Sequence, residues 1–245
     1  MDGQTPRGAR PVAASSVRRL VFSDEFNGTA VDTNKWVARS WARGGAVAPD
    51  TWSYSPANVS EHGGSLELAI GNPAESTYTG AEIDTAGKFG FAFGTLEARV
   101  HMPPTTGHLG AVWLNTNTIH RVDGTARDGA EIDVVETNYQ GDRYSATIHW
   151  DGYGADHQQS AAIAQAPALH SGWHVFGLNW TPSKLEFTYD GTVVRTVTDP
   201  ALISQVSEYA LLSHEVLDAW ADGSIHDETF GPSSSMYVDY IRVWQ

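Results

Sequence analysis

Polar and apolar residues alternate along several stretches of this chain with a period of two. In residues 95–102 every second residue is Leu, Ala, Val or Met, and residues 64–70 and 185–189 alternate in the same way. Because successive side chains of an extended strand point to opposite faces, this pattern predicts half-buried β-strands. The dipeptide Asp190-Gly191 directly follows the last of them and is typical of a tight hairpin turn.

Helical signals are confined to one short segment. Asp199 can cap a helix and Pro200 suits the first helical position, so a short helix is expected to begin there. Leu202, Ile203 and Val206 would form its apolar stripe.

The chain shows no internal repeat, no heptad pattern and no linker that would divide it. With 245 residues it can form one large all-β domain. We therefore predict a two-sheet antiparallel β-sandwich of the jelly-roll type, formed by residues 20–245 as a single domain. Residues 1–19 are polar and contain Pro, Ala, Ser and Arg, and we expect them to form a flexible N-terminal segment.

One predicted strand differs from the others because it carries three carboxylates. Glu131 and Asp133 are two positions apart and share a face, whereas Glu136 would point the other way. One extra residue, a β-bulge at about Val134-Val135, would return Glu136 to the face of the other two. Three like charges on one face repel one another, so we expect this cluster to serve chemistry on a concave sheet. A solvated acidic strand face is the alternative.

The chemistry that suits this spacing is glycoside hydrolysis. Two carboxylates that flank a glycosidic bond can act as nucleophile and general acid if their surroundings separate their pKa values. Glu131 and Glu136 would lean inward on the bent strand, and Asp133 would couple to both. The sequence contains no G-x-S-x-G nucleophile elbow, phosphate-binding loop or dinucleotide fingerprint, which would indicate other reactions.

Residues 129–136, Gly-Ala-Glu-Ile-Asp-Val-Val-Glu, followed by Thr-Ile-His-Trp at 147–150, resemble glycoside hydrolase family 16. The resemblance is to the branch with a bulged catalytic strand, which includes laminarinases, agarases and carrageenases. Further segments match in the family's order and extend the resemblance over residues 20–245: 22–26, 35–36, 54–59, 64–68, 88–99, 173–182 and 237–244.

By this resemblance Glu131 is the nucleophile, Asp133 an auxiliary acid and Glu136 the general acid/base of a retaining double displacement. The implied substrate is a β-linked polysaccharide cleaved internally, with β-1,3- or mixed β-1,3/1,4-glucan ahead of a β-galactan. Residues 150–157, Trp-Asp-Gly-Tyr-Gly-Ala-Asp-His, depart from the laminarinases and leave the sugar open. A transglycosylase would use the same acids. A non-catalytic glycan-binding module would share the fold but lose an outer glutamate.

The resemblance also implies residues that bind the sugar in the concave cleft. They come from the strands on either side of the acids, from the alternating strand at 95–102 and from an early hairpin. The expected set is Trp113, His149, Trp150, Glu97, Arg99, Asn58 and Trp52. A flat aromatic ring against the apolar face of a sugar buries area without ionic contacts.

Family members commonly hold a structural calcium ion, whereas the reaction needs no catalytic cofactor. Asp239 matches the family's late-strand aspartate ligand, and Glu25 and Gly64 match its backbone carbonyl donors. Oxygen-only ligation suits a hard cation such as Ca²⁺. The acidic, glycine-rich residues 151–156 also resemble a calcium loop, but their spacing fits no EF-hand.

The charge and composition of the chain limit the classes of molecule that it can bind. The net charge is −14, from 15 basic and 29 acidic residues, which argues against binding of nucleic acid or of an anionic membrane. No apolar run approaches the about 18 residues of a membrane span. The chain has no cysteine and therefore no disulfide. We expect a monomer that binds a polysaccharide and, by the resemblance, is secreted after removal of a signal peptide.

Overall fold

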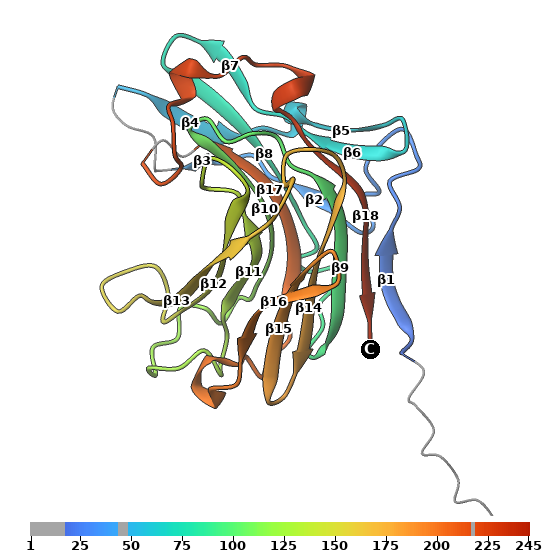
Figure 1. Ribbon diagram of the computed structural model, residues 1–245, viewed down its shortest axis with the longest axis vertical. Helices are drawn as coiled ribbons and strands as arrows, with labels where there is room; N and C mark the ends of the chain where they lie inside the picture. The colour runs from blue at the N-terminus through green and yellow to red at the C-terminus, as the bar shows by residue number, and fades with distance from the viewer. Residues whose placement is uncertain (1–17, 44–48, 217–218) are drawn as a thin grey trace, which may run out of the picture.

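The computed structural model describes residues 18–43, 49–216 and 219–245. Two large β-sheets pack face to face as two layers (Figure 1), which confirms the predicted all-β sandwich. The predicted N-terminal segment 1–19 lies outside the described residues, except for its last two positions. Across the described ranges, the helices are short 3₁₀ turns, and none has the length and apolar character needed to cross a membrane.

One layer, here called the back sheet, has eight strands. They are β1 (Leu20–Asp24), β5 (Val59–His62), β6 (Ser65–Leu68), β9 (Gly94–His101), β14 (His174–Thr181), β15 (Lys184–Tyr189), β16 (Thr192–Val197) and β18 (Met236–Trp244). Their order is β16-β15-β14-β9-β18-β6-β5, and β1 also pairs with β18. The first and last strands therefore lie side by side, as Figure 1 shows.

The other layer, here called the front sheet, has ten strands. They are β2 (Val37–Ala38), β3 (Ala42–Arg43), β4 (Thr51–Tyr54), β7 (Gly71–Ala74), β8 (Thr77–Asp84), β10 (His108–Asn115), β11 (Glu131–Glu136), β12 (Arg143–Trp150), β13 (Gln158–Gln165) and β17 (Tyr209–Val216). Their order is β13-β12-β11-β10-β17-β8-β4-β3, and β2 and β7 pair with β8. Pairing is antiparallel except between β4 and β8.

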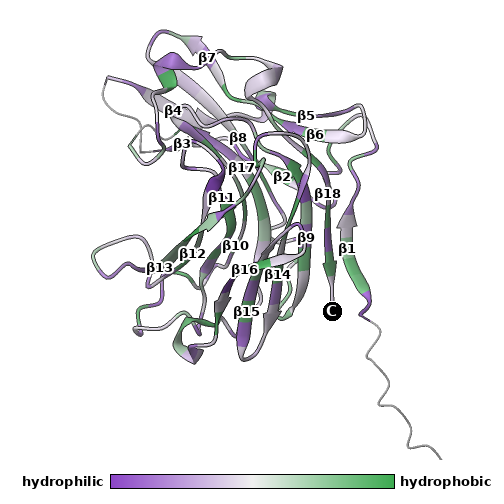
Figure 2. Ribbon diagram, in the orientation of Figure 1, coloured by the Kyte–Doolittle hydropathy of each residue, from purple (hydrophilic) through white to green (hydrophobic). Residues whose placement is uncertain are grey.

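The core lies between the sheets and follows the predicted alternation. Leu96, Ala98 and Val100 of β9 are fully buried and belong to one cluster with Val112 and Leu114 of β10. Figure 2 shows hydrophobic stretches on strands of both layers, interrupted by hydrophilic ones, including one at β11. Burial of this apolar surface, at about 25 cal/mol per Å², is the main force that holds the sheets together.

A second apolar cluster covers part of the other face of the front sheet. Leu109, Ala111 and Trp113 of β10 belong to it, and Ala111 and Trp113 alternate with Val112 and Leu114 of the main core. Trp52 and Tyr54 of β4 pack edge to face beside them, with ring centroids 5.0 Å apart. The outer face of the front sheet is therefore partly apolar, as a sugar-binding surface requires.

The 3₁₀ turns are η1 (Pro56–Asn58), η2 (Pro200–Leu202), η3 (Ile225–Asp227) and η4 (Pro232–Ser234). The helix predicted at Asp199-Pro200 begins where expected, because the Asp199 side chain accepts a 2.9 Å hydrogen bond from the Ala201 N–H. It ends after one turn, since Ile203 is extended and fully buried in the core. Burial of that side chain breaks the predicted stripe before Val206.

Candidate active site

β11 lies in the front sheet between β10 and β12 (Figure 1). In its pairing with β12, Asp133 faces Thr147 and Glu136 faces Ser145, so β11 has one more residue than its partner over this stretch. The extra residue lies at 134–135. The predicted bulge is confirmed.

The chain enters β11 through a glycine. Gly129 has a φ of 146°, and a Cβ at this position would overlap the side chains of Thr116 and Thr118. A residue without a side chain is needed for this close approach. The contact sets the start of β11 against the segment that follows β10.

A cleft of about 1190 Å³ lies over the outer face of the front sheet. Glu131, Asp133 and Glu136 all line it, together with Trp113 and His149. The bulge has therefore turned the three carboxyl groups onto one face. The volume exceeds the about 300–1,000 Å³ of most small-molecule pockets, so the cleft suits an extended ligand.

Glu131 receives two hydrogen bonds on a single carboxylate oxygen. The Tyr153 hydroxyl donates to its Oε2 at 2.5 Å, and Asn115 Nδ2 donates to the same atom at 3.0 Å. Burial and the adjacent Asp133 raise the pKa of Glu131 to about 8, while His149 and the hydrogen bond from Tyr153 act in the opposite direction. The two donors favour the ionised form of this acid.

Glu136 has a weaker set of donors. The Thr147 hydroxyl donates to its Oε2 at 3.2 Å, and this is its one hydrogen bond within the described residues. Burial, and next the charge of Asp133, raise the pKa of Glu136 well above its ordinary value. Of the two outer acids, Glu131 is therefore the better suited to lose its proton first, and Glu136 to keep one.

Asp133 lies between the outer acids and close to an imidazole. Its Oδ2 is 3.2 Å from His149 Nε2, without the alignment of a hydrogen bond. Burial, followed by the charge of Glu215 across the cleft, raises the pKa of Asp133 well above its ordinary value. His149 Nδ1 is 2.8 Å from His157 Nε2, and the two rings stack. One polar side-chain atom from each of Glu131, Asp133 and His149 lies within 4.8 Å of the other two.

The other end of the cleft carries paired charges. The Arg39 guanidinium binds Asp84 through two hydrogen bonds, one of them 2.8 Å long. Arg43 lies 3.3 Å from Glu215, whose Oε1 also accepts a 2.6 Å hydrogen bond from Tyr54. Each arginine here is committed to a carboxylate of the protein.

Residues 48–241 match the family model for glycosyl hydrolases family 16. The chain belongs to this family.

The family-16 relatives differ widely in length. The glucan endo-1,3-beta-glucosidase A1 of Niallia circulans is 25% identical over 92% of this chain, which spans only 38% of that protein. The beta-glucanase of Rhodothermus marinus is also 25% identical over 92% of the chain, and 85% of its length is covered. The solved endo-beta-1,3-glucanase of Pyrococcus furiosus is 25% identical, with a TM-score of 0.72 over 93% of this chain and 94% of that one.

Two of the predicted sugar-binding residues of this family-16 chain line the cleft. Trp113 is 9% exposed, and its Nε1–H donates to Ser213 at 3.1 Å. His149 pairs across strands with Glu131. Trp150 is a correction, because it is buried in the core between the sheets. Alternation along β12 turns it to the face opposite His149, so the two neighbours cannot both reach the cleft.

Two residues near the early hairpin are also corrections. Trp52 is 2% exposed within the second apolar cluster and does not line the cleft. Asn58 donates from Nδ2 to the Thr79 hydroxyl at 2.9 Å and to the Gly80 carbonyl at 3.2 Å, and so fastens η1 to β8. Both side chains support the sheet instead of facing the cleft.

The prediction that Glu97 and Arg99 face the cleft is also corrected, because both belong to the back sheet. The apolar residues of β9 point into the core, so its polar residues point away from the front sheet and its cleft. Arg99 lies 2.7 Å from Asp239 and over the ring of Trp173. The alternation predicted the strand and its two faces, but not which sheet the strand would join.

The predicted calcium ligands lie among ion pairs. The Asp239 carboxylate binds the Arg99 guanidinium at 2.7 Å, and the Glu25 side chain binds Arg242 at 2.6 and 2.9 Å. Gly64 has a φ of 82°, in a tight turn. A cation already neutralises the one side-chain ligand, so the donor set does not favour Ca²⁺ at this place.

Sequence reasoning missed Asn115 and Tyr153, the two donors to Glu131. Asn115 ends the strand that carries Trp113, and its parity along β10 could have placed it on the same face. Tyr153 lies in the unusual segment at 150–157, where the departure from the laminarinases was visible but its contact was not.

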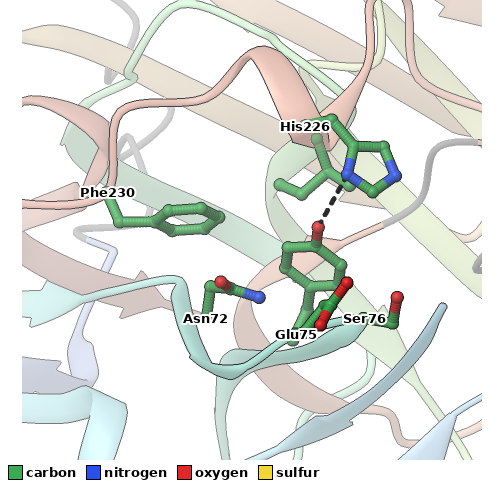
Figure 3. Close-up of a pocket in the computed structure, with 7 residues that line it drawn as sticks. Asn72, Glu75, Ser76, His226 and Phe230 are labelled. Carbon is green, nitrogen blue, oxygen red and sulfur yellow. Dashed lines mark hydrogen bonds between the residues drawn. The ribbon is translucent and has the colours of Figure 1, made fainter.

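A second cavity, of about 320 Å³, shares no lining residue with the cleft. Figure 3 shows Phe230, Asn72 and His226 beside it. The hydroxyl of Tyr78 lies 3.0 Å from His226 Nδ1. His226 Nε2 is in turn 2.8 Å from Asp50, a buried carboxylate. These contacts fasten η3 to β8, and the Asp50 carboxylate is paired with His226.

Proposed function

We propose that this chain is an endo-acting, retaining hydrolase of β-1,3- or mixed β-1,3/1,4-glucan. The observation that carries the proposal is the position of Glu131 and Glu136, which one bulge brings to the same face of a large cleft with unequal hydrogen-bond donors. Relatives named as glucan endo-1,3-beta-glucosidase and beta-glucanase support the substrate class. No catalytic cofactor is needed, because two carboxyl groups and water supply every reacting group.

In the first step, Oε1 of Glu131 forms a bond to the anomeric carbon while the glycosidic C–O bond breaks. Glu136 gives its proton to the departing oxygen, which leaves as a hydroxyl group. Oε1 is the attacking atom because Oε2 holds both donors. The products are a covalent glycosyl-enzyme and a shortened glycan with a free non-reducing end.

In the second step, Glu136 takes a proton from water as that water attacks the anomeric carbon. The bond to Oε1 breaks and Glu131 leaves as a carboxylate. Asp133, placed between the two acids and 3.2 Å from His149 Nε2, is coupled to both and disfavours their ionisation at the same time. Two inversions give net retention at the anomeric carbon.

Charge in the cleft favours a neutral polymer over a sulfated galactan. Both arginines that line it, Arg39 and Arg43, are paired with carboxylates of the protein. Its acids include Glu82, whose pKa is raised to about 7 by burial and by the charge of Glu215. A sulfate group would meet carboxylates and no uncommitted guanidinium among the described lining residues.

The test is a reducing-end assay on laminarin, lichenan, agarose, carrageenan and arabinogalactan, with chromatography of the products. A ladder of oligosaccharides from laminarin or lichenan supports the proposal, and the Glu131→Gln variant should abolish it. A ladder from agarose alone would replace the glucan with a galactan. Products longer than the substrate, formed when acceptor oligosaccharide is added, would identify a transglycosylase.

We also propose that the enzyme acts outside the cell, because its polymeric substrate cannot cross a membrane. We further propose that it is a monomer. Fractionation of producing cells and light scattering of the purified protein test the two points. Activity confined to the cytoplasm, or a stable dimer at micromolar concentration, would contradict them.

A further inference from the structure

Tyr153 lies in the connection between β12 and β13, which is held firmly at its start. Asp151 is buried, and its carboxylate accepts hydrogen bonds from the backbone N–H groups of Asp123 and Gly124 at 3.1 and 3.3 Å. Gln158 Nε2 donates to its other oxygen at 2.8 Å. These bonds tie the connection to the segment that leads into β11. These hydrogen bonds fix the backbone two residues before Tyr153.

The Tyr153 hydroxyl is part of a closed ring of three polar groups. It donates to Glu131 Oε2 at 2.5 Å and accepts from Asn115 Nδ2 at 2.8 Å, and Asn115 also donates to Glu131 Oε2 at 3.0 Å. Desolvation of the hydroxyl, and next the charge of Glu131, raise the pKa of Tyr153 well above its ordinary value, so the hydroxyl keeps its proton and stays a donor. All three bonds can form at once only when Glu131 is the acceptor.

We propose that Tyr153 is a positioning residue, which favours the ionised form of Glu131 and leaves its Oε1 free to attack the anomeric carbon. The inference rests on the proposed glycosidase function and deepens it. Both donors lie on Oε2, and the nearest ring nitrogen to Oε1, His149 Nε2, is 3.9 Å away. The carboxylate is thus fixed at one oxygen and available at the other.

The hydroxyl acts differently in the two steps. In the free enzyme it offsets part of the repulsion from neighbouring acids, so a larger fraction of Glu131 is ionised at neutral pH. In the glycosyl-enzyme, Oε2 is an ester carbonyl and accepts a weaker hydrogen bond. That bond strengthens again as the carboxylate departs, which favours the second step.

The charge state of Glu131 depends on groups from each element around it. The ionisable groups that face it come from four places: Asp133 and Glu136 on β11, His149 on β12, Tyr153 and the nearby His157 in the β12–β13 connection, and Tyr209 and Glu215 on β17 with Glu208 just before it. Of these, Tyr153 is the one that donates a hydrogen bond to it. Removal of this hydroxyl should therefore raise the pH at which Glu131 ionises.

Tyr153→Phe is a suitable variant because it keeps the ring. The side chain is 52% exposed, with the His120 and His157 rings beside it, so the fold does not depend on its burial. Tyr144→Phe is the matched control. It removes a hydroxyl that is buried in the core and has no hydrogen-bond partner in the structure.

The first readout needs no substrate. Titration of ¹³C-labelled glutamate carboxyl groups by NMR, with Glu131 assigned through Glu131→Gln, should show its midpoint about one to two pH units higher in Tyr153→Phe. Tyr144→Phe should leave the midpoint unchanged. An unchanged midpoint in Tyr153→Phe would overturn the inference whether or not any glycan is cleaved, so failure of the proposed function is separately visible.

The second readout is kinetic. On the polymer that the reducing-end assay identifies, Tyr153→Phe should lower kcat about 10- to 100-fold with little change in KM, and should shift the acidic limb of kcat/KM upward in pH. A shifted midpoint with wild-type kcat would mean that the hydroxyl tunes the acid without serving the reaction. A rise in KM alone would assign Tyr153 to sugar binding.

Discussion

β11 of the front sheet and β9 of the back sheet show the same alternation of apolar and charged residues, yet they treat charge in opposite ways. On the back sheet, Arg99 of β9 lies 2.7 Å from Asp239 of the neighbouring β18. On the front sheet, Asp133 lies between two glutamates of its own strand. One strand pairs its arginine with an acid of the next strand, and the other gathers like charges in a buried place.

The difference shows which cluster is there for stability and which for chemistry. An exposed ion pair such as Arg99–Asp239 contributes about 0–1 kcal/mol and keeps an outer face soluble. Buried like charges cost free energy of folding, and the protein retains them at the base of a cleft. Four sets of substitutions test this contrast, from the largest expected effect to the smallest.

Glu131→Gln and Glu136→Gln should each lower kcat about a thousandfold or more, because each removes a reacting group. Glu97→Gln, the same change on the back sheet, is the matched control and should retain wild-type activity. Initial rates on laminarin or lichenan measure the effect, with circular dichroism to confirm folding. Near-wild-type turnover in either front-sheet variant would refute the assignment of the acids.

Trp113→Ala should raise KM for polymer about 10- to 100-fold, because a cleft-lining ring that can stack on sugar is lost. Trp173→Ala removes a more exposed tryptophan, one that lies under Arg99 on the back sheet, and should leave KM unchanged. Steady-state kinetics on one polymer compare the two. Equal effects would show that sugar also binds to the back sheet.

Asp133→Asn should stabilise the protein, and the gain should grow with pH. The pKa of Asp133 is raised in the folded state, so ionisation costs folding free energy once the pH exceeds its unfolded value of about 3.9. We expect a gain of about 1–3 kcal/mol near pH 8 that vanishes near pH 3. Urea denaturation at both pH values measures it.

Asp239→Asn is the control for this stability change, because its carboxylate is paired with Arg99. It should show no gain at either pH. A loss of stability in Asp133→Asn at pH 8 would mean that the aspartate is stabilised as an ion in the folded protein.

Arg99→Ala should have the smallest effect, a loss of at most about 1 kcal/mol with unchanged activity. Excess EDTA should likewise leave Tm unchanged, since the guanidinium already neutralises Asp239. Differential scanning calorimetry measures both. A Tm that rises with added Ca²⁺, and does so no longer in Asp239→Ala, would restore the calcium site that the family resemblance implied.

The local pattern of the sequence was sufficient to predict the strands and the shared face of the three acids. Period-two alternation is a property of the backbone, so residues 95–102 predicted β9 without knowledge of its neighbours. The count of residues from Glu131 to Glu136 required a bulge for the same reason. Alternation also forbids His149 and Trp150 from sharing a face, a constraint that the family resemblance had obscured.

Only the tertiary structure decided which strands became neighbours. The same alternating residues would suit a strand of either sheet. The sequence therefore placed Glu97 and Arg99 on a polar face but could not say which sheet that face belongs to. The hydrogen bond from Tyr153 to Glu131 spans 22 residues and depends on where Asp151 anchors its connection. Alternation acts between adjacent residues, whereas sheet membership and loop docking depend on contacts between residues far apart in the chain, and no local pattern encodes them.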